Sequence, residues 1–239
     1  MVRVAQEVVR ADAIVTPVPS RRSTSWLLGC GVLVGPLFVT VIVIEILTRT
    51  GFDLRRNGIS QLSLGERGWI QIANFVIAGL LTVAFAIGAR RVLRPGPGAT
   101  VAPLGIVGYG CGLVATGLFL VDPGVGFPPG TPEGFSEMSW HGLVHAAAPP
   151  ISFLLLVGVC GVFARRSAIR RQRGLAIYCL ATGIAALALI CWPGAGGSLR
   201  SAAAVLVTSV WMTVVAGTLL RETEERTEVL ATTSADFTD

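Results

Sequence analysis

Apolar residues in this chain occur in long continuous blocks. Alternation at every second residue would predict strands, and a stripe at every third or fourth residue would predict amphipathic helices. Blocks of about 18 or more residues with almost no charge instead predict helices that cross a membrane. Six such blocks are present, at residues 26–48, 69–89, 101–121, 141–163, 175–192 and 201–220.

Composition places the chain among integral membrane proteins. Hydrophobic residues make up 52% of it and charged residues 14%, and the mean hydropathy is +0.70. A soluble domain carries about a quarter of its residues as charged ones. We therefore predict an all-α fold, a six-helix transmembrane bundle. Its parts are an N-terminal tail (1–25), a six-span membrane domain (26–220) and a C-terminal tail (221–239).

The arginines are divided unequally between the two sides of this bundle. All 19 basic residues are arginines, and an even number of spans puts both tails on one side. That side then holds Arg3, Arg10, Arg21, Arg22, Arg90, Arg91, Arg94, Arg165, Arg166, Arg170, Arg171, Arg173, Arg221 and Arg226, against Arg49, Arg55, Arg56, Arg67 and Arg200 on the other. Cytoplasmic segments carry the excess of positive charge, so we predict that both termini are cytoplasmic.

The net charge of +5 and the isoelectric point near 9.4 do not indicate nucleic-acid binding. The charge lies beside the spans, where it sets topology and attracts anionic lipid headgroups. Basic residues that are all arginine are typical of a bacterial genome of high GC content. We expect a multi-pass protein of the bacterial plasma (inner) membrane, with membrane lipid as a partner and without nucleic acid.

Polar residues gather at the predicted outer end of the spans. Glu45 lies one turn from the outer end of the first span, and Asp122 ends the third. His141 begins the fourth span, and His145 lies one turn deeper. The first outer loop, RTGFDLRRNGISQLSLGERG, is polar along most of its length. Residues from separate segments at one depth predict a shared site.

The stretch SWHGLVH contains both histidines of the chain, four positions apart. On a helix, residues at this spacing share a face, so both rings can reach one ion. With Asp122 and a water molecule, His141 and His145 would form a catalytic-type zinc site. Alternatively, Trp140 and His141 lie at the headgroup level as an interfacial pair, and Asp122 begins an Asp-Pro turn.

The first outer loop is unusually basic for that side of a membrane. Its arginines can hold a phosphate or carboxylate, and its amide and hydroxyl groups can add hydrogen bonds. In the alternative, the loop is solvated and its arginines pair with nearby acidic residues. The candidate ligand-binding residues are Asp53, Arg55, Arg56, Asn57 and Ser60.

Several features predict how the helices pack. Glu45 precedes Arg49 by four residues, the favourable order for an ion pair on a helix. Short loops make the second and third spans, and the fourth and fifth, antiparallel neighbours. Pro149 and Pro150 should bend the fourth span below the histidines. Glycines on the third span allow close approach of a partner helix: Gly105, Gly108, Gly112 and Gly117.

The segment FDLRRNGISQLSLGERGWIQIANFVIAGL resembles a family of predicted membrane proteins named domain of unknown function 998. The residues that carry the resemblance are Phe52, Asp53, Asn57, Ile59, Ser60, Leu64, Gly65, Asn74, Phe75, Gly79, Asp122, Pro123, His141, Gly142 and His145. The resemblance covers about residues 26–220. It implies a six-helix membrane protein and carries no established activity.

A weaker similarity connects the chain with alkaline ceramidases and progestin/adiponectin-type receptors. In that superfamily a Ser, an Asp and an HxxxH pair form a zinc hydrolase site in the membrane. Ser60, Asp122, His141 and His145 correspond to these parts. The superfamily also has seven spans and a third histidine, which this sequence lacks.

Two functions follow from these patterns. In the first, the protein has an outward-facing polar pocket for a lipid headgroup or small polar ligand, with no assigned catalysis. In the second, it is a zinc-dependent intramembrane hydrolase of a lipid amide or ester. Zinc would then be held by His141, His145 and Asp122, and the candidate catalytic residues are Asp122 and Ser60.

Overall fold

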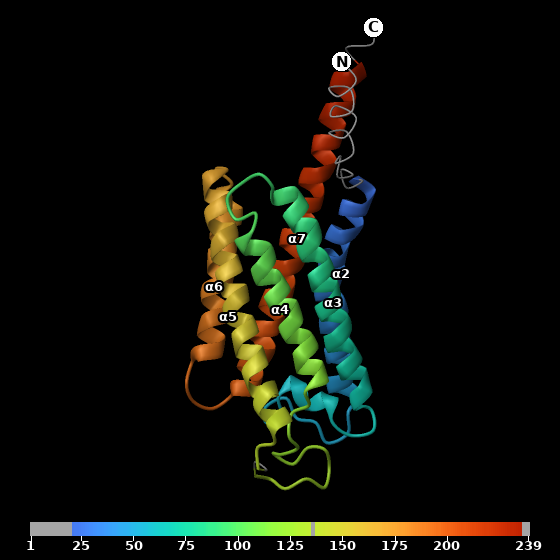
Figure 1. Ribbon diagram of the computed structural model, residues 1–239. Coiled ribbons are helices and arrows are strands. Elements are labelled where there is room, and N and C mark those ends of the chain that lie inside the picture. Colours follow the sequence, from blue (N-terminus) through green and yellow to red (C-terminus); the bar gives the residue numbers. More distant parts are fainter. Residues whose placement is uncertain (1–20, 135–136, 236–239) are drawn as a thin grey trace, which may run out of the picture.

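A computed structural model describes residues 21–134 and 137–235 of the chain. Six long α-helices run along one axis (Figure 1), and one short 3-10 helix, η2, lies in the first loop. Most of the predicted N-terminal tail (1–20) and the last residues of the C-terminal tail (236–239) lie outside the described residues. The helices are α2 (Arg21–Thr48), α3 (Gly68–Leu93), α4 (Val101–Leu118), α5 (Trp140–Ile169), α6 (Arg173–Cys191) and α7 (Gly197–Ala235), and η2 is Ile59–Ser63.

All six α-helices are long and apolar enough to cross a membrane. The shortest, α4, has 18 residues, which at ~1.5 Å per residue nearly spans a ~30 Å hydrocarbon core. The prediction of a six-helix transmembrane bundle is therefore confirmed, and the chain is an integral multi-pass membrane protein. Helical hydrogen bonds continue past the apolar blocks, so α2 begins at Arg21 and α7 extends to Ala235.

The helices form a ring in which each packs against its neighbours in sequence, and α7 closes the ring against α2. The predicted neighbours α3 and α4, and α5 and α6, are confirmed. Because six helices alternate in direction, the start of α2 and the end of α7 lie at the same end of the bundle (Figure 1). We call this the terminal end. The opposite end, the loop end, comprises residues 49–67, the described part of 119–139, and 192–196.

Glycines on α4 bring it close to both neighbours, as predicted. A Cβ atom on Gly105 would lie 2.4 Å from Val159, and one on Gly108 would lie 2.6 Å from Leu155, both on α5. A Cβ atom on Gly117 would lie 3.0 Å from Phe75 on α3. A methyl group on any of these glycines would therefore displace the neighbouring side chain or its helix, since real Cβ contacts are longer.

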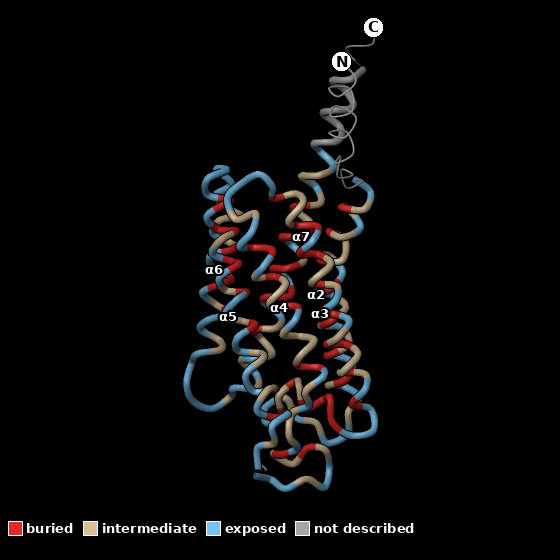
Figure 2. Tube along the Cα trace, viewed as in Figure 1, coloured by how far each residue is buried: buried red, intermediate tan, exposed pale blue. Residues whose placement is uncertain are grey.

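Buried residues line the interior of the bundle, and exposed residues cover its outside (Figure 2). Many of the exposed residues are large and apolar, such as Leu47 and Ile177. A water-soluble protein rarely exposes so much continuous apolar surface, whereas lipid tails solvate it well. The outer surface is therefore that of a protein surrounded by lipid.

An ion-pair cluster ties α5 to α7 at the terminal end. The Glu222 carboxylate lies 2.7 Å from the Arg170 guanidinium and 3.8 Å from that of Arg166. Arg166 and Glu222 are largely withdrawn from solvent. Beyond this point α7 continues past the other helices (Figure 1).

Candidate ligand-binding site

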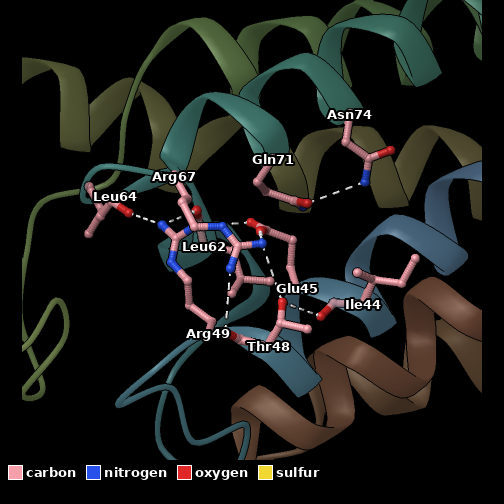
Figure 3. A network of polar contacts seen from close by, with 9 residues as sticks. All are labelled: Ile44, Glu45, Thr48, Arg49, Leu62, Leu64, Arg67, Gln71 and Asn74. Atoms are coloured by element: carbon pink, nitrogen blue, oxygen red, sulfur yellow. Dashed lines mark hydrogen bonds and ion pairs between the residues drawn. The ribbon is translucent and has the colours of Figure 1, made fainter.

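A buried ion-pair cluster closes the bundle at the loop end (Figure 3). Glu45, on the last turns of α2, is only 1% exposed. One carboxylate oxygen lies 3.3 Å from the guanidinium of Arg49, and the other lies 3.3 Å from that of Arg67, just before α3. The predicted pairing of Glu45 with Arg49 is confirmed. A charge taken out of water needs such partners, because an unpaired one is costly to bury.

Arg49 also fixes the first loop above this cluster. Its guanidinium donates to the carbonyls of Leu62 and Leu64, at the end of η2 and just after it. It also lies over the Phe127 ring, 5.9 Å from the ring centre, in a cation–π contact. One arginine therefore joins α2, the first loop and the loop between α4 and α5.

The loop after α2 and the loop after α4 are tied together by buried amide side chains. Asn57 Nδ2 donates to the Val125 carbonyl at 3.2 Å, and Gln61 Nε2 donates to the Gly124 carbonyl at 2.8 Å. Both side chains are buried. A buried amide that lost its hydrogen bond would destabilise the fold, so these contacts hold the two loops in position. The two loops therefore form one cap over the bundle.

Four of the five predicted ligand-binding residues lie in the part of this cap that precedes η2. The Asp53 carboxylate accepts from the Arg55 backbone N–H at 2.9 Å, and Asn57 Oδ1 accepts from the Asp53 N–H at 3.0 Å. The Arg56 guanidinium pairs with Glu133 in the other loop, and Arg55 is exposed. These contacts shape the loop and join it to its neighbour. Ser60 differs, since it lies on η2 and faces the cavity described below.

Asp122 holds the start of α5. Its carboxylate accepts from the Ser139 backbone N–H at 2.8 Å, and the Ser139 hydroxyl in turn accepts from the Gly142 N–H at 3.0 Å. Hydrogen bonds from the Ser139 side chain and backbone hold the pKa of Asp122 below its usual value. A Cβ atom on Gly142 would lie 1.9 Å from this carboxylate, so the site admits only glycine. Asp122 thereby joins the end of α4 to the N-terminus of α5.

The two histidines have separate partners. His145 is buried, and its Nδ1 lies 2.7 Å from the Phe119 carbonyl, which ends α4. His141 is exposed and stacks on Trp140, with ring centres 3.5 Å apart. Among the described residues, no group of three or more His, Cys, Asp or Glu side chains could hold a metal ion. As arranged, His141, His145 and Asp122 do not form a three-ligand set, and the zinc site stays a prediction.

Beneath the cap lies a cavity of about 270 Å³. Its walls come from α2, α3, α4, α5, α7 and the region of η2, while α6 takes no part. Most of the wall is apolar, with hydroxyl and imidazole groups interspersed. The lining residues are Phe38, Gly58, Ile59, Ser60, Phe75, Tyr109, Leu113, Thr116, His145, Ala146, Pro149, Pro150, Ser152, Phe153, Ser201 and Val205.

The cavity has an exposed edge formed by residues of α5 and α7. Three of its lining residues are exposed: Ala146 and Pro150 on α5, and Ser201 on the first turns of α7. At ~1.5 Å per residue, Ala146 and Pro150 lie about 9 and 15 Å below the start of α5 at Trp140. That depth is within the apolar part of a span, so the exposed edge lies on the side of the bundle that faces lipid.

Residues 32–218 match the family described as protein of unknown function (DUF998). The match covers most of the chain, with α3 to α6 complete and the larger part of α2 and of α7. The chain belongs to this family. The DUF998 region includes the Glu45 cluster, the two tied loops and every residue that lines the cavity. No curated protein and no solved structure matches the chain.

Several residues of the DUF998 site carry no signal that sequence patterns could have used. Thr116, Ser152 and Ser201 are single hydroxyl residues within apolar helices, and only the packing of α4, α5 and α7 brings them to one cavity. Arg67 lies far from Glu45 in sequence, so spacing could not predict their pairing. The Pro149–Pro150 pair was a visible signal, because it interrupts helical hydrogen bonding at the cavity wall, and Ser60 and His145 were predicted as site residues.

Proposed function

We propose that this protein binds a membrane lipid or another small amphipathic molecule in the cavity beneath its loop-end cap. The ligand enters from the bilayer, between α5 and α7. The exposed edge formed by Ala146, Pro150 and Ser201 is the observation that supports this proposal. A soluble ligand would need a path through the cap, where Asn57 and Gln61 bind the opposite loop.

The size of the cavity supports a single chain or a compact molecule as the ligand. Pockets for small molecules typically enclose about 300–1,000 Å³, and this cavity of about 270 Å³ is near the lower limit. A lipid with two long chains would fit only in part. The lining is amphipathic, since the hydroxyls of Ser60 and Thr116 and the imidazole of His145 lie among apolar side chains such as Leu113 and Phe153.

The distribution of arginines supports an orientation with the loop end outside the cell. Most arginines of the chain belong to the terminal end, and the positive-inside rule places that end in the cytoplasm. Loop-end arginines are largely balanced by partners, such as Arg49 and Arg67 by Glu45 and Arg56 by Glu133. The cavity is then outward-facing, in the plasma membrane of a bacterium.

The zinc-hydrolase alternative has less support. Asp122 is occupied with the N-terminus of α5, and His145 is occupied with the end of α4. These contacts give both residues a structural task in joining two helices. Zinc analysis of the purified wild-type protein beside the His141→Ala and His145→Ala variants tests this alternative, which requires zinc in the wild type and its loss in both variants.

Photo-crosslinking tests the binding proposal. The protein is reconstituted in vesicles that contain a diazirine-bearing long-chain alcohol, and the labelled peptides are mapped by mass spectrometry. We expect labelling of α5 and of the first turns of α7. An Ala146→Trp variant should lose this labelling, because the indole occupies the exposed edge of the cavity.

Ala147→Trp is the matched control, since Ala147 is also exposed on α5 but does not line the cavity. It should label like the wild type. Equal labelling of the two variants, or labelling spread evenly over the exposed helix faces, would contradict the proposal.

A further inference from the structure

We infer that the polar group of the ligand is uncharged and donates a hydrogen bond, as a hydroxyl or an amide N–H does. The inference rests on the proposed function and specifies the class of ligand. It follows from the hydrogen bonds that the polar groups of the cavity wall already donate within the protein. The walls offer lone pairs for a ligand to donate to, and they offer few hydrogens and no charge.

Three hydroxyl groups of the wall donate to their own helices. Thr116 donates to the Gly112 carbonyl at 2.8 Å, Ser152 to that of Ala148 at 2.6 Å, and Ser201 to that of Gly197 at 2.8 Å. A hydroxyl has one hydrogen and two acceptor lone pairs. With its hydrogen given to the backbone, each of these oxygens can only accept from a ligand.

The imidazole of the wall follows the same pattern. His145 Nδ1 faces the Phe119 carbonyl at 2.7 Å, and a carbonyl only accepts, so Nδ1 carries the hydrogen. In the neutral ring, Nε2 then has no hydrogen to give.

Two proline residues add acceptors to the same wall. Pro149 and Pro150 have no backbone N–H, so they cannot donate to the carbonyls of His145 and Ala146, four residues earlier in α5. All four residues line the cavity. Ser60 on η2 and Tyr109 on α4 are the remaining lining hydroxyls and can present a hydrogen to the ligand. Acceptors therefore outnumber donors at the polar part of the cavity.

A charged ligand group would find no counter-charge here. None of the lining residues, all of which lie in the described part of the chain, is an aspartate, glutamate or arginine. The guanidinium of Arg49 in the cap is directed at Glu45 and at the Leu62 and Leu64 carbonyls. An unpaired charge in an apolar cavity is strongly unfavourable, whereas a neutral donor gains hydrogen bonds.

Competition against the photoreactive alcohol tests the inference in reconstituted vesicles. The competitors share one chain length and are added at equal mole fractions of the bilayer: dodecanol, dodecanamide, methyl dodecanoate and dodecyl phosphate. We expect the alcohol and the amide to compete about three- to tenfold better than the ester, which has acceptors but no donor. The phosphate should compete least.

The outcomes separate this inference from the proposed function. If the ester competes as well as the alcohol, or the phosphate competes best, the cavity binds chains but the inference about the polar group is wrong. If labelling does not depend on Ala146 and no competitor acts, the proposed function itself fails.

A pair of threonine variants tests whether hydrogen-bond acceptors of the cavity wall cause the preference for alcohol over ester. Thr116→Val should reduce the preference for alcohol over ester about threefold while leaving ester competition unchanged, because valine keeps the shape and removes one acceptor. Thr82→Val is the control, since Thr82 is buried and donates to the Ala78 carbonyl but does not line this cavity. An unchanged preference in Thr116→Val, or an equal loss in both variants, would overturn the assignment.

Discussion

At the scale of single residues, the polar groups at the loop end serve mainly to hold segments together. Asp122 fixes the start of α5, His145 fixes the end of α4, and Asn57 joins the two loops. Asp122 and His145 bond backbone groups at helix ends, which lack helical partners and need others. Hydrogen bonds of this kind fix the positions of the helices and loops that form the cavity wall.

Removing the Glu45 carboxylate should destabilise the protein. In Glu45→Gln, two arginines lose their shared counter-charge, and Arg49 is largely buried. We expect a loss of about 3 kcal/mol in the free energy of unfolding, since breaking a buried ion pair leaves an uncompensated charge. Unfolding of the purified protein in detergent, followed by circular dichroism, measures this loss.

Glu133→Gln is the matched control, because it removes the same group from an exposed pair with Arg56. Exposed pairs contribute about 0–1 kcal/mol, so this variant should unfold almost like the wild type. Equal effects of the two substitutions would show that the buried position of Glu45 has no special importance.

Sequence patterns predicted the residue contacts that are local and missed those that cross the bundle. The four-residue spacing of Glu45 and Arg49 was enough to predict their pairing. His141 and His145 have the same spacing, yet one ring stacks on Trp140 and the other reaches back to Phe119. Helical spacing places two side chains on one face but cannot determine which partner each will take.

At the scale of elements, the contact between α4 and α5 determines the shape of the cavity. Gly112 on α4 lies against Ser152 on α5, where an added Cβ would come within 1.6 Å of the Ser152 hydroxyl and 2.8 Å of its Cβ. Ser152 lines the cavity, so this close approach positions one of the acceptors. Small residues at such contacts allow backbones to approach and pack.

Gly112→Ala should therefore destabilise the protein and disturb ligand binding. The added methyl group forces Ser152 and the helix that carries it to move, and overpacking of this kind costs about 1–3 kcal/mol. We expect a lower midpoint of thermal unfolding together with weaker labelling by the photoreactive alcohol.

Gly158→Ala on α5 is the control, because a Cβ at Gly158 would meet no atom within 4 Å. Alanine favours helix over glycine, so this variant should be as stable as the wild type or slightly more stable. A stable, normally labelled Gly112→Ala protein would show that α4 and α5 can separate without cost.

Helices were easier to predict than the elements between them. Six apolar blocks correspond to the six observed helices, because a chain in lipid must satisfy its backbone hydrogen bonds within each span. The 3-10 helix η2 follows no such rule, since its place depends on Arg49 and on contacts with the other loop. The exposed edge of the cavity depends on how α5 and α7 pack in the bundle, which no local pattern encodes.

At the scale of the whole molecule, the two ends of the bundle differ in charge. The terminal end carries many arginines and extends along α7, whereas the loop end has fewer and pairs most of them with acidic residues. This asymmetry relates the position of the cavity to the two sides of the membrane. If the positive-inside rule applies, the cavity lies in the outer half of the bilayer.

Accessibility of single cysteines in intact cells tests this orientation. The starting protein has its five cysteines, Cys30, Cys111, Cys160, Cys179 and Cys191, replaced by alanine. Ala195→Cys places a thiol in the exposed loop before α7, and Arg171→Cys places one in the exposed turn between α5 and α6. A membrane-impermeant maleimide should label the first in intact cells and the second only after the membrane is opened.

The opposite pattern would reverse the orientation and place the cavity in the cytoplasmic half of the bilayer, without changing its lining or its preference for a neutral donor. Labelling of both positions in intact cells would contradict a single crossing between them and the fold itself, since α6 alone separates these two loops. The experiment therefore separates the direction of insertion, which rests on charge, from the bundle, which rests on apolar length and packing.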